Sequence, residues 1–493
     1  MGLQDGPLHG DFEKAHNPFQ FYDYSEESKK AWVRFLKEVK HLSLKEVNTL
    51  TGKNFPTWED VTLPPAFEYK GGRYREKIWS LFTEFQVYGV ANVFERLFIA
   101  IRSVDKNTPV EIRVGGGANE WFVKGFDFSA LVALCKKYNG ILVQTNSASD
   151  MQVSCLGSLT KSFYLPFSTE VGTPPNEFQV ARGLFNTIKV GGKALFYCYW
   201  QAGRPADDWA YLKPLWKKVI NNNRITDNIC LLHISQLPSY DEHLIKMARK
   251  KNNFFTFFSD LNYQYSVLML PSQIPQDKKI ILFDANNLWI DEEWRRLLDK
   301  HIADGGILVL NYLSDSQNGY GYLKQLLPGI KIDTLKSQEN IIYNIPEKKE
   351  IILSTDEGIK FSVPAEFTDR IDILTRWGDG SIAAFSYKKE NGGKMFLIGF
   401  PFTDFVPFKG SDGKQVIEYL FKKTGIARHI IPSEYGVQAV VLYDTEGHKK
   451  LVLYNGNNYT VESRFFVSGD RIPKRGEFSL KVGQNTLLLK EIF

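Results

Sequence analysis

A glutamate at position 170 stands where a strand-like run ends and a helix-like run begins. The run before it, FYLPFST at 163–169, is apolar and aromatic with β character. Pro174 and Pro175 follow, and apolar residues then recur on one helical face. Carboxylates act in enzymes as nucleophiles and as proton donors or acceptors. Glu170 is therefore a candidate catalytic residue; the alternative is a carboxylate that caps the following helix.

The elements that would position Glu170 are strands that alternate with helices, with a mixed segment between the strands at 140–146 and 163–169. Each predicted strand is a nearly continuous apolar run, which is typical of buried parallel strands joined by β/α units. This pattern fits a doubly wound sheet or part of an eight-stranded β/α barrel, and both place functional groups at the carboxyl ends of strands. Glu170, Asn146 and Trp200 lie at such ends. The predicted strands are 109–116, 140–146, 163–169 and 194–200.

Three further regions surround this alternating part. Residues 25–102 have a helical pattern, with a capping box at Ser43–Glu46 and a long helix over 74–102. A second α/β region begins near Asn228, and 436–493 alternates like a small antiparallel β module. In the second region we predict strands at 228–235, 266–271, 278–285, 307–312, 381–387 and 394–400, and helices at 239–251, 291–306 and 414–426.

Composition excludes several classes of protein. The 61 basic and 56 acidic residues of the 493-residue chain are scattered, so we expect no nucleic-acid partner. No run approaches the roughly 18 apolar residues of a membrane span. The four cysteines lack CxxC spacing and lie in or beside apolar segments, which predicts buried free thiols. We expect no metal site and no cofactor, and the sequence assigns no compartment. The 14% aromatic content fits either core packing or a sugar-lined cleft.

Three segments resemble the family 42 glycoside hydrolases, the bacterial β-galactosidases, and related barrel glycosidases of their clan. The first runs from YSEESKKAW to DVTLPP (24–65), the second is FERLFIAIRSVDKNTPVEIRVGG (94–116), and the third runs from ILFDANNLW to GGILVLNY (281–312). The resemblance implies an α/β chain in three parts. These are strands four to eight of a (β/α)8 TIM barrel in 1–225, an amidotransferase-like trimerisation domain in 226–430, and a small antiparallel β domain in 436–493. It also implies a homo-oligomer, a trimer in the family.

The resemblance also assigns roles to residues. FSTEVGTPP resembles the segment that carries the family's nucleophile, so Glu170 takes that role in retaining hydrolysis of β-galactoside-like oligosaccharides. ALFYCYWQ resembles the eighth barrel strand, whose terminal aromatic, here Trp200, lines the sugar site; Asn146 and Trp121 are further substrate contacts. LQDGPLHGDFE resembles the Gly-Pro-x-Gly-Glu loop of some related barrel glycosidases, with Asp11 in place of its glutamate. Asp11 is therefore the candidate acid/base, and Glu13, Asp5 or a group outside the chain are the alternatives.

The order of segments also predicts a departure from the family. Strands one to three of the barrel have no counterpart, so the chain is expected to begin inside or just after strand four and to be a feeble glycosidase by itself. A non-catalytic carbohydrate-binding or assembly protein is the alternative function. The predicted elbow LSDSQNG (313–319) lacks the cysteine that amidotransferase chemistry requires, so we do not expect that activity in the second region.

Overall fold

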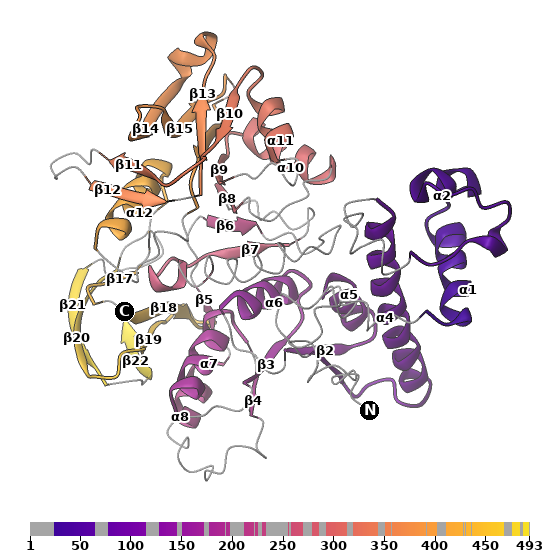
Figure 1. Cartoon of the computed structure of the whole chain (residues 1–493). Helices are drawn as coiled ribbons and strands as arrows, with labels where there is room; N and C mark the ends of the chain where they lie inside the picture. The colour runs from indigo at the N-terminus through magenta and orange to yellow at the C-terminus, as the bar shows by residue number, and fades with distance from the viewer. Residues whose placement is uncertain are drawn as a thin grey trace. The chain divides into compact units, whose positions relative to one another are not determined.

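The structure of the protein is a computed structural model, and its chain divides into two compact units. One unit contains 1–145 and 235–248, and the other contains 146–234 and 249–493 (Figure 1). The described residues are 24–64, 77–114, 128–144, 150–171, 177–192, 194–197, 212–220, 222–224, 229–232, 255, 258–269, 279–284, 292–312, 319–343, 351–355, 357–390, 392–401, 411–426, 428, 430–434, 436–467, 476–483 and 487–492.

The first unit opens with a small helical core. Trp32 is almost completely buried, and its ring packs against Phe35, Phe82 and Phe85 with centroids 5.3–5.8 Å apart. The predicted capping box is confirmed, because the Ser43 side chain accepts from the Glu46 N–H and the Glu46 carboxylate accepts from the Ser43 N–H. The elements are α1 (Glu26–Arg34), the π-helix η2 (Phe35–Val39), α2 (Leu44–Thr51), the 3-10 turn η3 (Trp58–Asp60) and α4 (Lys77–Val104).

The long helix α4 leads into a β/α/β unit. Strands β1 (Val110–Val114) and β2 (Gly140–Gln144) are parallel, and α5 (Phe128–Lys137) connects them. Arg102 of α4 donates from its guanidinium to the carbonyl oxygens of Tyr138 and Asn139, which follow α5. The Phe98 and Tyr138 rings stack with centroids 5.4 Å apart. These contacts fix the end of α4 beside the start of β2.

The second unit continues the alternation of helices and strands. Strands β3 and β4 are parallel, and α7 lies between them in sequence. Strand–helix alternation across 105–222, predicted from the sequence, is thereby confirmed for the described residues. The elements are α6 (Asp150–Ser162), β3 (Phe167–Val171), α7 (Glu177–Lys189), β4 (Ala194–Tyr197) and α8 (Leu212–Val219).

A large mixed sheet follows in the same unit. Its parallel part has the order β16-β9-β8-β6-β7, and antiparallel strands extend it beyond β16. The core between this sheet and α10 and α11 includes Trp294, Leu298 and Tyr322. The elements are β6 (Ile229–Leu232), β7 (Ser266–Leu268), β8 (Ile280–Asp284), α10 (Glu292–Ala303), β9 (Ile307–Asn311), α11 (Gly319–Leu326), β10 (Lys331–Thr334), β11 (Glu339–Tyr343), β12 (Ile351–Thr355), β13 (Ile359–Ser362), η11 (Ala365–Arg370), β14 (Ile371–Trp377), β15 (Ile382–Lys388), β16 (Lys394–Ile398) and α12 (Ser411–Thr424).

The last strands form two antiparallel sheets. One has the order β17-β20-β21 and the other β22-β19-β18-β5. The strands are β5 (Asn223–Arg224), β17 (Ile430–Pro432), β18 (Val437–Tyr443), β19 (Lys449–Asn455), β20 (Val461–Val467), β21 (Gly476–Val482) and β22 (Leu487–Ile492). The antiparallel pairing expected for 436–493 is found, and β5, from before the second α/β region, joins the same sheet.

Two buried amide side chains attach β18 to the segment that precedes β7. Asn262 donates to the Val437 carbonyl at 3.1 Å and accepts from the Ala439 N–H at 2.8 Å. Gln264 donates to the Ala439 carbonyl at 2.8 Å. The Asn262 amide therefore satisfies backbone groups of β18 in the way that a neighbouring strand would.

Several predicted elements differ from the structure. The segment before β3 was expected to be mixed, but it forms α6 over most of its length, and β3 starts at Phe167 rather than at 163. Tyr164, in the turn that follows α6, adopts a left-handed φ of 58°. Three apolar residues of α4 are exposed although their helical spacing fits a buried stripe: Val93, Leu97 and Ile101. The predicted helix at 239–251 lies outside the described residues, and the sequence pattern had predicted no elements for 319–377.

Candidate active site

The strand that carries Glu170 is covered on both faces. Phe167, Ser168 and Thr169 are successive residues of β3 and all are buried, as expected for a parallel strand between two layers. Glu170 pairs with Phe196 of the parallel strand β4. Glu170 is the penultimate residue of β3, so its backbone lies at the carboxyl end, where α/β folds hold functional groups.

A buried hydroxyl pair joins β3 to α7 next to Glu170. The oxygens of Thr169 and Thr187 are 2.6 Å apart, and Thr187 donates its proton to the Gly183 carbonyl at 2.7 Å. Since Thr187 has one hydroxyl proton, Thr169 is the donor between the two threonines. This contact fixes the last turns of α7 against β3, one residue before Glu170.

The apolar face of α7 packs against the C-terminal strands. Ala181, Leu184, Phe185 and Ile188 form one core with residues of β18 and β19. The ring of Phe185 stacks on Tyr454, with centroids 5.7 Å apart. Helix α7 is consequently buried on two sides, with β3 on one and the C-terminal sheet on the other.

The last residue of α7, Lys189, is a buried lysine that the sequence pattern did not predict. The Lys189 ammonium donates to the Ser259 hydroxyl and lies 5.5 Å from the centroid of the Tyr265 ring. The Tyr265 hydroxyl in turn lies 3.1 Å from the Ser154 hydroxyl of α6. A cation at a helix carboxyl end is favoured by the helix dipole, and the aromatic face adds a cation–π contact. A lysine after an apolar helical stripe gives no sequence signal of burial.

The other candidate residues belong to segments outside the described part of the chain. Asp11, Trp121, Asn146 and Trp200 all lie outside the described residues, as does the side chain of Glu170. In sequence, Asn146 follows the last residue of β2 by two positions and Trp200 follows β4 by three. The separation of the two catalytic carboxylates therefore stays a prediction.

Other expectations concern thiols, metals and membranes. Cys135 and Cys155 are free and buried, as predicted, and burial raises the pKa of Cys135 to about 12. Within the described ranges, no three His, Cys, Asp or Glu side chains are grouped as a metal site. No helix in that part of the chain is long and apolar enough to span a bilayer.

Comparison with solved structures gives the fold. An α-L-fucosidase isoenzyme 2 from Paenibacillus thiaminolyticus matches 91% of this chain and 73% of its own, with a TM-score of 0.57 at 10% identity. An exo-carrageenase, GH42, from Bacteroides ovatus matches 95% of this chain with a TM-score of 0.54 at 11% identity. The chain is similar in fold to these two enzymes. Both relatives are TIM-barrel glycosidases.

These comparisons establish a likeness of fold and assign no family. This chain spans 63% of the length of the carrageenase. No known family model matches the sequence, and no curated protein sequence matches it significantly. The fold agrees with the expected likeness to barrel glycosidases, whereas no family is shown for this chain.

Proposed function

We propose that this protein is a glycoside hydrolase that cleaves β-galactoside-like oligosaccharides with retention of configuration. The observation that carries the proposal is the position of Glu170 at the carboxyl end of β3, in a chain similar in fold to a fucosidase and a carrageenase. Residues on a strand alternate between its faces. Because Thr169 contacts α7, the proposal places Glu170 on the opposite face of β3.

The proposed chemistry has two steps. In the first, the Glu170 carboxylate attacks the anomeric carbon while Asp11 gives its proton to the leaving oxygen, which forms a glycosyl ester. In the second, the Asp11 carboxylate takes a proton from water, the water oxygen attacks the anomeric carbon, and Glu170 leaves as a carboxylate. Such a pair needs carboxyl groups about 5–5.5 Å apart. Asn146, Trp121 and Trp200 are proposed as substrate contacts.

Assays on nitrophenyl glycosides test this proposal. The panel contains the β-galactoside, β-glucoside, β-mannoside and α-L-fucoside, the last because one structural relative is a fucosidase. We expect a β-glycoside to be cleaved and the β-anomer to appear first by NMR. Glu170→Gln should abolish the activity, and Glu59→Gln, at an exposed position of η3, should not change it.

Azide rescue separates the two carboxylates. With Glu170→Gly, azide should attack in place of the nucleophile and yield the α-glycosyl azide; with Asp11→Gly it should yield the β-glycosyl azide. Full activity of Glu170→Gln would refute the nucleophile assignment. If the chain cleaves no member of the panel, a non-catalytic sugar-binding or assembly role becomes the better interpretation.

The family resemblance also supports a proposal on assembly. We expect residues 226–430 to act as an amidotransferase-like association domain, residues 436–493 as a separate β domain, and the protein to form a homo-oligomer, a trimer by resemblance. Light scattering coupled to size-exclusion chromatography at micromolar concentration measures this directly. A monomer would contradict it.

A further inference from the structure

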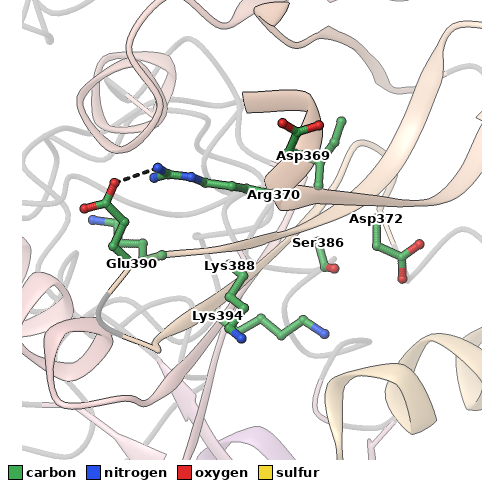
Figure 2. Close-up of a pocket in the computed structure, with 9 residues that line it drawn as sticks. Asp369, Arg370, Asp372, Ser386, Lys388, Glu390 and Lys394 are labelled. Atoms are coloured by element: carbon green, nitrogen blue, oxygen red, sulfur yellow. Dashed lines mark hydrogen bonds and ion pairs between the residues drawn. The ribbon is translucent and has the colours of Figure 1, made fainter. Parts of the chain in front are cut away.

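A charged pocket lies beside the end of η11, at the start of β14, the end of β15 and the start of β16. Its volume is about 460 Å³, within the range of sites for small molecules. Arg370 and Glu390 form an ion pair of 2.6 Å at one side of the pocket (Figure 2). The lining side chains are Asp369, Arg370, Ile371, Asp372, Ser386, Lys388, Lys389, Glu390 and Lys394.

Two lysines of the pocket face each other across neighbouring strands. Lys388 of β15 is directly opposite Lys394 of β16 in the antiparallel register. Like charges in opposite positions destabilise a sheet. Neither lysine forms an ion pair with a residue that the structure describes, and the Lys394 ammonium lies 4.7 Å from the centroid of the Phe396 ring. Within the described residues, neither ammonium therefore has a carboxylate at ion-pair distance.

A buried hydroxyl lies beside the two lysines. Ser386 is two positions before Lys388 on β15, so both are on the same face of the sheet. Only 2% of Ser386 is exposed, and its hydroxyl makes no hydrogen bond with any described residue. Because Ser386 lines the pocket, its hydroxyl can donate its proton to a ligand bound there.

A carboxylate completes the arrangement. Asp372 is directly opposite Ser386 in the pairing of β14 with β15. Figure 2 shows Asp372, Ser386, Lys388 and Lys394 on one side of the strands. Asp372 has no ion-pair partner in the described part of the chain. An ionised carboxylate only accepts hydrogen bonds, so a ligand for this site needs hydroxyl donors as well as negative charge.

We propose that this pocket binds a small hydroxylated oxyanion, that is, a monosaccharide with a sulfate, phosphate or carboxylate group. Lys388 and Lys394 hold the oxyanion, Ser386 donates to it, and Asp372 accepts from a ring hydroxyl. Charge-assisted hydrogen bonds of this kind are shorter and stronger than neutral ones. This site is additional to the proposed glycosidase site on β3 and does not depend on it.

Calorimetric titration of the full chain tests the proposal. The probes are galactose 6-sulfate, glucose 6-phosphate, glucuronate, neutral galactose and inorganic sulfate. We expect at least one of the three anionic sugars to bind, and to bind about tenfold or more tightly than inorganic sulfate. The identity of the sugar that binds shows whether the oxyanion is a sulfate, a phosphate or a carboxylate.

Variants then assign the binding to this pocket. The double variant Lys388→Gln/Lys394→Gln should lower the affinity about tenfold or more, and Ser386→Ala should lower it by a smaller factor. Lys331→Gln on β10 is the matched control, because Lys331 is opposite Ser362 and lines no part of the pocket. Thermal melts confirm that each variant is folded.

Three results would overturn the proposal. The first is that no anionic sugar binds at millimolar concentration. The second is that inorganic sulfate binds as tightly as the sugars, which would remove the role of the hydroxyl groups. The third is that the double lysine variant keeps the affinity of the wild type.

Discussion

The hydroxyl oxygens of Thr169 and Thr187 lie 2.6 Å apart in the buried layer between β3 and α7. Their protons are ordered, with Thr169 donating to Thr187 and Thr187 donating to Gly183. The two hydroxyl groups are therefore not equivalent. Loss of the Thr187 oxygen leaves a buried donor on Thr169, whereas loss of the Thr169 hydroxyl leaves only an acceptor with one bond fewer.

This asymmetry predicts different costs for two similar substitutions. Thr187→Val should lower the free energy of unfolding by about 1–3 kcal/mol, because a buried donor is left without a partner. Thr169→Val should lower it by about 0.5–1.5 kcal/mol. Urea denaturation of both variants measures the difference. Equal costs would show that the proton order is wrong.

Gly157 of α6 is predicted to be intolerant of a side chain. A Cβ atom there would lie 2.6 Å from the Val190 Cβ, although alanine favours a helix. We expect Gly157→Ala to destabilise the fold by about 1–3 kcal/mol through overpacking. Val190→Ala in the same chain should not relieve this cost, because alanine keeps the Cβ atom that the new side chain would meet.

The control for this substitution is Gly89→Ala in α4. No atom lies within 4 Å of the Cβ position at Gly89. This variant should therefore gain up to about 1 kcal/mol from helix propensity. A Gly157→Ala chain that is as stable as Gly89→Ala would contradict the packing argument.

The opposed lysines of the charged pocket predict a stabilising substitution. Without ligand, Lys388→Gln should raise the free energy of unfolding by about 0.2–1 kcal/mol, because the like-charge pair with Lys394 is removed. The gain should shrink as salt increases, since ions screen exposed charges. Lys331→Gln should show no such gain. A lower melting temperature for Lys388→Gln at low salt would refute the prediction.

A pH-dependent contribution is expected from Asp379. Its hydrogen bond with the Lys360 ammonium, followed by those from Ser381, lowers the pKa of this carboxyl to about 2. Because the pKa is lower in the folded state, the stabilisation is present above the unfolded value near 3.8 and is lost as pH falls toward 2. Because the Asp379 side chain is half exposed, the stabilisation should not exceed about 1 kcal/mol.

NMR titration of the side-chain carboxyls measures this effect. Lys360→Gln should raise the pKa of Asp379 toward its ordinary value. Asp105 is an internal control, because Thr108 and the Asn107 N–H, rather than Lys360, lower its pKa to about 2. If the Asp379 pKa does not change in Lys360→Gln, the ion pair is not its cause.

Local sequence patterns predicted much of the fold but not the partners of each face. The alternation of strand and helix placed Glu170 at the end of β3 without any knowledge of tertiary structure. The apolar stripe of α7 was also visible, yet it packs on β18 and β19, which are more than 240 residues further along the chain. An amphipathic pattern specifies that a face is buried and does not specify against which element.

Two misses have identifiable physical causes. Helix α6 was read as mixed because Gly157 and several serines weaken its helical signal, and the close approach to Val190 that requires Gly157 is a tertiary contact. Strands β10 and β14 were not predicted, since exposed polar residues interrupt their apolar pattern. Helix α4 shows the reverse case, with apolar Val93 and Leu97 that fit a core stripe and yet lie exposed.

The amides of Asn262 and Gln264 also bear on how such a chain could evolve. Because these amides form hydrogen bonds with the backbone of β18, the C-terminal strands could not be exchanged alone between proteins of this fold. A gene fusion that ended before Val437 would leave both amides facing water or an unrelated surface. A recombination that kept the fold would have to carry residues 258–269 together with β18 and β19, although the sequence separates them by about 170 positions.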